Sequence, residues 1–297
     1  WSSDVCSSDL DRFNDDLLVV AYMNTSGRIK AIAGKTGGAV CTSSNAHLVV
    51  DWARKKGKRI LFIPDEHLGR NTAAKIGMDP RKIVTFPNPT VHGIDWSIDD
   101  VKGIDECEMM LWGGHCGVHT VFTESQVERW QNHGWQVLVH PEAPIEVVQA
   151  ADGSGSTSYL WNTVMNASEG SKIAVGTEGH FVRNLKEQAA IRGIEVVHLA
   201  EATSERAVGS GMNVGDTGGA GGCGCATMSR NDPPHLAGML DLLRIGEAPD
   251  LNRVLAGDTI DEHTARRERL SEDDRNILIV HAKLALKRMI DITENAK

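Results

Sequence analysis

Short apolar runs alternate with longer amphipathic segments along most of the chain. The apolar runs predict β-strands at 17–22, 59–63, 82–86, 108–112, 136–140, 172–176 and 194–199. Segments with helical periodicity predict helices at 46–56, 124–133, 156–167 and 180–193. Alternation of strands and helices is typical of parallel sheets with helices on both faces. The pattern therefore predicts an α/β fold.

Polar and ionisable residues follow five of the predicted strands. LLVVAY runs into Met-Asn-Thr-Ser, RILFI into Pro-Asp-Glu-His, EMMLW into Gly-Gly-His-Cys, QVLVH into Pro-Glu, and KIAVG into Thr-Glu-Gly-His. Ligands of open α/β sheets bind beyond the carboxyl ends of the strands. Five such strand ends indicate a converging site and favour an enzyme.

Two of the predicted helices begin with hydroxyl-bearing residues. The sequence Gly-Ser-Thr-Ser at 155–158 precedes one helix, and CTSSNA at 41–46 precedes another. The amide groups and dipole at a helix start favour an anion, and hydroxyl groups add donors. These segments are compatible with a phosphate or carboxylate cradle. Ordinary helix capping by Ser156 explains the first one equally well.

Composition narrows the possible partners. The chain has 297 residues, enough for about two domains. Its net charge of −9 argues against a nucleic-acid or membrane-surface partner. The apolar runs are too short to span a bilayer. No basic segment followed by an apolar one opens the chain, so we expect a cytoplasmic protein.

The six cysteines are too scattered for a disulfide scaffold: Cys6, Cys41, Cys107, Cys116, Cys223 and Cys225. Scattered thiols in a cytosolic α/β protein are more often buried, catalytic or metal-bound. The stretch GDTGGAGGCGCATM at 215–228 places two of them on a glycine-rich loop. We interpret Cys41 and Cys107 as core residues.

The first ten residues, WSSDVCSSDL, repeat Ser-Ser-Asp and contain no initiator Met. We interpret residues 1–10 as a non-native tail similar to a translated sequencing adapter, and leave Cys6 out of the fold prediction.

Eight motifs occur in an order and spacing that resembles the quinolinate synthase family. They are Y-x-N-T-S at 22–26, C-T-S-S-N-A at 41–46, P-D-E-H-L-G-R at 64–70, W-G-G-H-C-G-V-H at 112–119, H-P-E at 140–142, A-D-x-x-G-S-T-S at 151–158, G-T-E at 176–178 and C-A-T-M at 225–228. The resemblance extends from residue 17 to about residue 245. It implies a transferase of NAD biosynthesis that condenses iminoaspartate with dihydroxyacetone phosphate.

The resemblance also implies an architecture and a cofactor. The family has three Rossmann-like αβα domains of three layers each, arranged with pseudo-threefold symmetry. Its [4Fe–4S] cluster is held by three cysteines, and an iron without a protein ligand can act as a Lewis acid in dehydration. By motif position, Cys116 and Cys225 match two of the three ligands. Cys223 has no clear ligand counterpart, although a regulatory disulfide is one possible role.

Substrate contacts carry over by motif in the same way. Tyr22 and Asn24 match substrate-facing positions, and Ser43, Ser156 and Thr157 match groups that hold phosphate or carboxylate oxygens. His140 and Glu142 match residues beside the cluster and substrate, where they are expected to transfer protons together with Tyr22. Four further residues are near-site candidates without assigned roles: His67, His119, Glu178 and His180.

The family's first domain has no counterpart in the chain. We expect a second family domain at 11–119, a third at 120–228 and a helical extension at 229–297, with a surface helix at 277–290. The third cluster cysteine is expected upstream, so the fragment alone is expected to hold a cluster poorly and to show little activity. The resemblance also implies a functional link to L-aspartate oxidase or aspartate dehydrogenase, which would supply iminoaspartate.

Two other functions remain compatible with the sequence. One is another cluster-dependent hydro-lyase, because an open iron serves dehydration in general. The other is a non-enzymatic metal-binding or redox protein that uses Cys223 and Cys225. The second alternative predicts that a peptide spanning 215–230 binds metal by itself.

Overall fold

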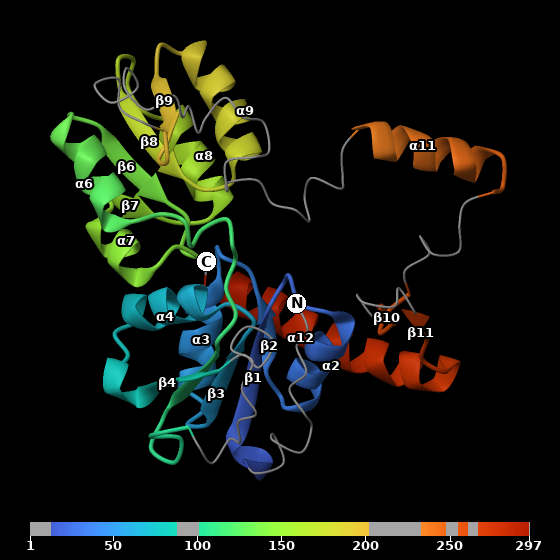
Figure 1. The fold of residues 1–297 in the computed structure, drawn as a ribbon. Coiled ribbons are helices and arrows are strands. Elements are labelled where there is room, and N and C mark those ends of the chain that lie inside the picture. The colour runs from blue at the N-terminus through green and yellow to red at the C-terminus, as the bar shows by residue number, and fades with distance from the viewer. Residues whose placement is uncertain (1–12, 88–100, 202–232, 248–254, 261–266, 297) are drawn as a thin grey trace. The chain divides into compact units, whose positions relative to one another are not determined.

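The computed structural model describes residues 13–87, 101–201, 233–247, 255–260 and 267–296 (Figure 1). The chain forms two compact units. Unit 1 comprises residues 1–114 and 237–297, and unit 2 comprises residues 115–236. Each unit is built around its own parallel sheet.

Unit 1 contains a five-stranded parallel sheet with the order β2-β1-β3-β5-β4. The strands are β1 Leu17–Tyr22, β2 Ala39–Cys41, β3 Arg59–Ile63, β4 Ile83–Phe86 and β5 Met109–Trp112. The connecting helices are α2 Gly27–Lys35, α3 Ala46–Arg54 and α4 Glu66–Lys75, and short 3₁₀ turns lie at Asn14–Asp16 and Pro80–Lys82.

Unit 2 contains a four-stranded parallel sheet with the order β7-β6-β8-β9. Its strands are β6 Gln136–Val139, β7 Gly153–Ser154, β8 Lys172–Gly176 and β9 Glu195–His198. Its helices are α6 Glu124–Asn132, α7 Ile145–Ala150, α8 Thr157–Met165 and α9 Gly179–Ala190. The first strand of each unit lies between the second and third, so chain direction across the sheet reverses beside β1 and beside β6.

Both faces of the unit 1 sheet are buried. Along β1, Val19 packs in one apolar cluster with Ile29 of α2, while Val20 packs in a second cluster with Val49 of α3. Unit 2 likewise has two clusters, one with α8 and α9 and one with α6 and α7. Fully burying one such aliphatic side chain contributes about 1.5–3 kcal/mol. Because both faces of each sheet are buried, the strands are continuous apolar runs in the sequence.

The long C-terminal helix α12, Glu272–Asn295, packs on α2 of unit 1. A Cβ at Gly34 would lie 1.8 Å from the carbonyl oxygen of His281, so only glycine permits the helices to approach this closely. Arg288 donates hydrogen bonds to the carbonyl oxygens of Gly34 and Gly38, at 3.2 and 2.7 Å. The antiparallel strands β10 Thr259–Ile260 and β11 Arg267–Glu268 form a separate two-stranded sheet.

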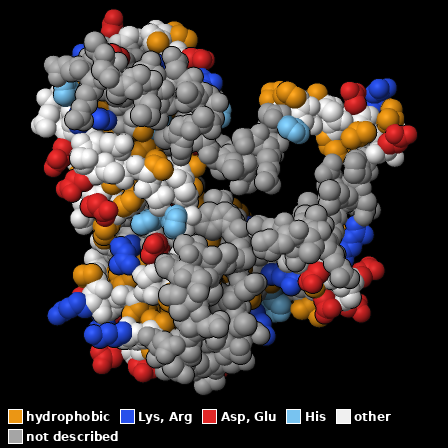
Figure 2. Space-filling view, viewed as in Figure 1, with side chains coloured by type: hydrophobic (Ala, Val, Ile, Leu, Met, Phe, Trp, Pro, Cys, Tyr) orange, Lys and Arg blue, Asp and Glu red, His pale blue; other side chains and the backbone are white. Residues whose placement is uncertain are grey.

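Helix α11, Pro233–Arg244, exposes apolar side chains, and none of its residues is buried (Figure 2). Leu236, Leu240 and Leu243 are each more than half exposed. Among the described residues, no helix combines the length and apolarity that a bilayer crossing requires.

The predicted α/β fold with parallel sheets is confirmed. All seven predicted strands are present, with boundaries that differ from the prediction by at most one residue, and the four helices predicted between them are also present. Further elements of the described chain were not predicted: α2, α4, α7, β2, β7, β10 and β11. The C-terminal helix is longer than predicted because Ser271 caps it at its amino end, accepting a hydrogen bond from the amide of Asp274.

Candidate functional site

The carboxyl edge of the unit 2 sheet gathers a buried group of polar side chains. His140 and Glu142 follow β6, and Thr177 follows β8. His119 lies on the segment between β5 and α6 and reaches the same place. Because β6 and β8 flank the point where strand order reverses, this group occupies the position at which open α/β sheets bind ligands.

His119 is the centre of this group. Its Nε2 lies 3.1 Å from the hydroxyl of Thr177, and its Nδ1 lies 2.9 Å from Oε2 of Glu142. The Nδ1 atom is buried and has no aligned hydrogen-bond partner among the described residues, despite its closeness to the carboxylate. All three residues are buried, with relative exposures of 7%, 1% and 4% for His119, Thr177 and Glu142.

His140 stacks on His119, with ring centroids 4.5 Å apart and an angle of 21° between the rings. Its Nδ1 accepts a hydrogen bond from the amide of Glu142 at 3.4 Å, which leaves the ring proton of the neutral form on Nε2. Burial, followed by the neighbouring His119, lowers the pKa of His140 to about 4. His140 is therefore neutral near pH 7.

His198 supports the group from β9. Its Nε2 donates to the carbonyl oxygen of Thr177 at 2.8 Å, and its Nδ1 accepts from the amide of Ala200 at 3.2 Å. Burial lowers the pKa of His198, so its ring is also held in the neutral form. These contacts fix Thr177, which in turn orients His119. Neither Thr177 nor His198 was singled out from the sequence, although Thr177 lies within the Gly-Thr-Glu motif.

Cys116 lies close to His119 and Glu142. One ligand atom from each of the three residues can be chosen so that all three atoms lie within 4.8 Å of one another. Cys116 is partly exposed, whereas Cys41 and Cys107 are buried. Burial raises the pKa of both the Cys41 and Cys107 thiols, which agrees with their interpretation as core residues. Cys116 is therefore the thiol in the described part of the chain that is best placed to bind metal.

Glu178 and His180 form a separate pair after β8. Glu178 caps α9 by accepting from the amide of Phe181 at 2.9 Å, and it accepts from Nδ1 of His180 at 2.7 Å. Burial acts to raise the pKa of Glu178, but the hydrogen bonds from Phe181 and His180 outweigh it and lower the pKa overall. The geometry gives Glu178 a capping role.

Ser156 has the capping role that the sequence left open. Its hydroxyl accepts from the amide of Tyr159 at 3.3 Å at the start of α8, and Thr157 is the first residue of that helix. Capping does not exclude anion binding by the remaining hydroxyls and amides of this turn.

The unit 1 residues lie at the equivalent edge of their own sheet. Tyr22 ends β1 and is paired in register with Cys41, which ends β2. Tyr22 is 8% exposed, and Asn24 and Ser43 lie in the loops that follow these two strands. Asn45 turns back toward this second loop, accepting from the amide of Thr42 at 2.7 Å. The two loops predicted to bind substrate therefore follow adjacent strands, at the same edge of the sheet.

Two other residues of unit 1 follow β3. Asp65 caps α4 by accepting from the amide of Leu68 at 2.7 Å, and His67 lies in the first turn of that helix. The predicted metal ligand Cys225, together with Cys223 and Cys6, lies outside the described residues.

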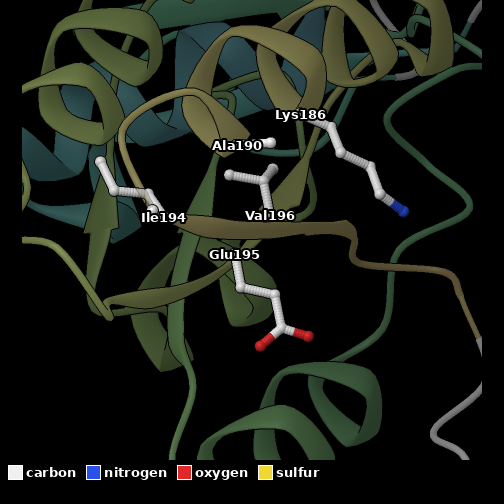
Figure 3. A pocket seen from close by; sticks show the side chains of 6 residues that line it. Lys186, Ala190, Ile194, Glu195 and Val196 are labelled. Atoms are coloured by element: carbon white, nitrogen blue, oxygen red, sulfur yellow. The ribbon is translucent and has the colours of Figure 1, made fainter.

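A shallow depression elsewhere in unit 2 is not lined by a cluster of buried polar side chains. It is lined by Lys186 and Ala190 of α9 and by Ile194, Glu195 and Val196 at the amino end of β9. Figure 3 shows that the side chains of Lys186 and Glu195 point in different directions. The depression lies at the wrong end of the strands for a ligand site of this fold class.

The family model and the similar proteins all point to the same family. The family model described as "Quinolinate synthetase A protein" matches residues 4–254. The chain is 38% identical over 279 residues to a quinolinate synthase of Streptomyces coelicolor, covering 93% of the chain and 60% of that protein. It is 34% identical over 285 residues to one of Staphylococcus carnosus, covering 95% of the chain and 65% of that protein. The chain therefore spans about 60% of the length of these relatives.

Proposed function

The chain belongs to the quinolinate synthetase A family, and on this basis we propose that it forms part of a quinolinate synthase. The proposed reaction condenses iminoaspartate with dihydroxyacetone phosphate, releases inorganic phosphate and water, and yields quinolinate for NAD biosynthesis. The observation that carries the proposal is the buried group of His119, His140 and Glu142 beside Cys116, at the strand-order reversal of unit 2.

The partly exposed thiol of Cys116 fits one corner of a [4Fe–4S] cluster, which takes mainly thiolate ligands. A partly exposed thiol lies beside a buried imidazole nitrogen that lacks an aligned hydrogen-bond partner in the described structure. We assign Cys116 and Cys225 as two cluster ligands, with the third ligand in the portion of the relatives that the chain does not cover. When bound, the cluster would supply a Lewis acid for removal of hydroxide.

Glu142 is the residue best placed to move a proton. Its carboxylate oxygen lies 2.9 Å from Nδ1 of His119, so a small rotation that aligns the two groups would let a proton pass between them. A positioned acid or base of this kind contributes about 10²–10⁴-fold to a rate. His140 is neutral near pH 7 and serves as a hydrogen-bonding group for a substrate oxygen.

The remaining assigned residues bind substrate in this proposal. Tyr22, Asn24 and Ser43 would contact substrate at the carboxyl edge of unit 1, with the Tyr22 hydroxyl assisting proton transfer. Hydroxyls of Ser156 and Thr157 would hold a phosphate or carboxylate at the start of α8. Iminoaspartate must come from an enzyme that oxidises aspartate, such as L-aspartate oxidase or aspartate dehydrogenase.

The experiment that tests the proposal restores the length of the relatives. The chain replaces the region that it matches in the Streptomyces coelicolor protein, which restores the rest of that protein's length, and the cluster is assembled without oxygen. We expect quinolinate formation from the two substrates, loss of the brown chromophore in Cys116→Ser, and a rate reduced about 100-fold or more in Glu142→Gln. The unextended chain is expected to bind less than one cluster and to turn over poorly. A fully loaded extended protein without turnover would overturn the proposal.

A further inference from the structure

Three different metal-ligating side chains meet beside the unit 2 sheet. The thiol of Cys116, the imidazole of His119 and the carboxylate of Glu142 each offer an atom within 4.8 Å of the other two. Two of these atoms, Nδ1 of His119 and Oε2 of Glu142, are 2.9 Å apart. Two ligands about 2.0–2.1 Å from a tetrahedral ion are separated by about 3.3 Å, so small side-chain adjustments would suffice.

The surroundings of His119 resemble those of a metal-bound histidine. Its Nδ1 is buried without an aligned hydrogen-bond partner in the described structure, although burying such an atom is costly. Its Nε2 faces the hydroxyl of Thr177 at 3.1 Å, as the second nitrogen of a ligating histidine usually faces a polar group. Thr177 is held in place by His198 through its carbonyl oxygen.

We propose that Cys116, His119 and Glu142 bind a single divalent ion of the zinc type, independently of an iron–sulfur cluster. One thiolate, one imidazole and one carboxylate suit Zn²⁺ or Co²⁺, whereas a [4Fe–4S] cube takes mainly thiolates. Three protein ligands leave a fourth tetrahedral position open to water or to an anionic ligand. The site lies within unit 2 and needs neither Cys225 nor the upstream cysteine.

An ion at this position would compete with the proposed catalytic use of the same residues. It would occupy the Cys116 sulfur needed by the cluster and the Glu142 carboxylate needed for proton transfer. Zinc is therefore expected to act as an inhibitor of cluster loading.

The test uses the 297-residue chain, stripped of metal with a chelator and titrated with Co²⁺ in the absence of oxygen. We expect one Co²⁺ per chain, with the visible bands of tetrahedral Co²⁺ and a near-ultraviolet thiolate-to-cobalt band, all removed by one equivalent of Zn²⁺. Cys116→Ser should remove the near-ultraviolet band, and His119→Ala should remove the tetrahedral bands. Thr177→Val should weaken binding about 10- to 100-fold.

Two controls keep the proposal falsifiable. His180→Ala removes an exposed histidine of the same unit and should leave Co²⁺ binding unchanged, and circular dichroism verifies folding of each variant. The double variant Cys223→Ser/Cys225→Ser should lose cluster assembly yet retain the Co²⁺ bands, so this proposal and the cluster proposal fail separately. Retention of the thiolate band in folded Cys116→Ser, or its loss in the double variant, would overturn the inference.

Discussion

Units 1 and 2 share a strand order around their first strands but differ in the residues at the carboxyl ends of those strands. After β3 and β8 the two units are alike: Asp65 and Glu178 cap the next helix, and a histidine lies two residues later. After β1 and β6 they diverge. Unit 1 has Tyr-x-Asn at residues 22–24, while unit 2 has His-x-Glu at residues 140–142.

This difference distinguishes residues that cap helices from residues whose burial has no structural explanation. A capping carboxylate is already explained by the helix amide that it accepts from, so its presence says little about function. His140 and Glu142 cap no helix of the described chain and are nevertheless buried. Burying ionisable groups costs free energy, and their burial at the strand-order reversal is the ground on which we propose a functional role for them.

The units also complete their cores differently. Unit 1 receives α12 from the distant C-terminal part of the chain, whereas unit 2 is a continuous segment. Disturbing the packing of α12 on α2 should therefore lower the stability of unit 1 more than that of unit 2.

The largest expected effect comes from Gly34→Ala. The added Cβ would overlap the backbone of His281, so α2 and α12 must separate and lose buried contacts. We expect unit 1 to lose about 3 kcal/mol of unfolding free energy, measured by hydrogen exchange of β1 and β3 amides.

The matched control is Gly238→Ala in α11, where an added Cβ meets no atom within 4 Å. This change should be neutral or stabilising by up to about 1 kcal/mol. Equal loss of protection in β6 and β8 of Gly34→Ala would show that the two units do not differ in their dependence on α12.

A smaller effect is the pH dependence of the stability of unit 2, which arises from His140. The pKa of His140 falls from 6.5 in the unfolded chain to about 4 in the folded state. The unfolded state therefore binds the proton more tightly, and stability that is fully present above pH 6.5 is lost as the pH falls toward 4. We expect a loss on the order of 2–3 kcal/mol for this residue, with a further loss of the same sign from His198.

The measurement compares unfolding of the unmodified chain with that of His140→Gln between about pH 7 and about pH 4. The difference between them isolates His140, because the carboxylates titrate in both proteins. Identical pH dependence in the two proteins would show that His140 does not contribute to the pH dependence of stability.

The smallest expected effects concern the helix-capping carboxylates that the two units share after β3 and β8. Asp65→Ala and Glu178→Ala should each cost about 1 kcal/mol of stability, because each removes one N-cap hydrogen bond. Urea unfolding of the two variants gives the values. A tenfold or larger loss of turnover in the extended protein from Glu178→Ala, without a matching loss from Asp65→Ala, would show that Glu178 is more than a cap.

The strands of the fold were predictable because their apolar residues are contiguous and buried on both faces. Helix α2 was missed because Gly27 and Gly34 weaken its helical pattern, and Gly34 is required by a partner far away in the sequence. Helix α4 reads as polar, with Gly69 in its first half. Strands β2 and β7 are only three and two residues long, and are defined by pairing with their neighbours.

The candidate site was predictable only in part. The position of His140 and Glu142 after a strand, together with the motif resemblance, singles them out from the sequence alone. The stacking of His119 on His140 and the role of Thr177 depend on contacts across 21 and 58 residues of sequence. No local pattern encodes such contacts. All the assigned roles remain predictions: the substrate residues Tyr22, Asn24, Ser43, His140, Glu142, Ser156 and Thr157, and the metal ligands Cys116 and Cys225.

The packing of α12 on α2 determines the order in which the two units can complete their folding during synthesis on the ribosome. Arg288 bonds to Gly34 across 254 residues, so the strands of unit 1 and all of unit 2 emerge before this contact can form. Until then Ile29 and Ala33 on α2 lack the cover that α12 provides. A nascent chain in this state exposes apolar surface to other molecules, and its first unit should depend on chaperones longer than its second.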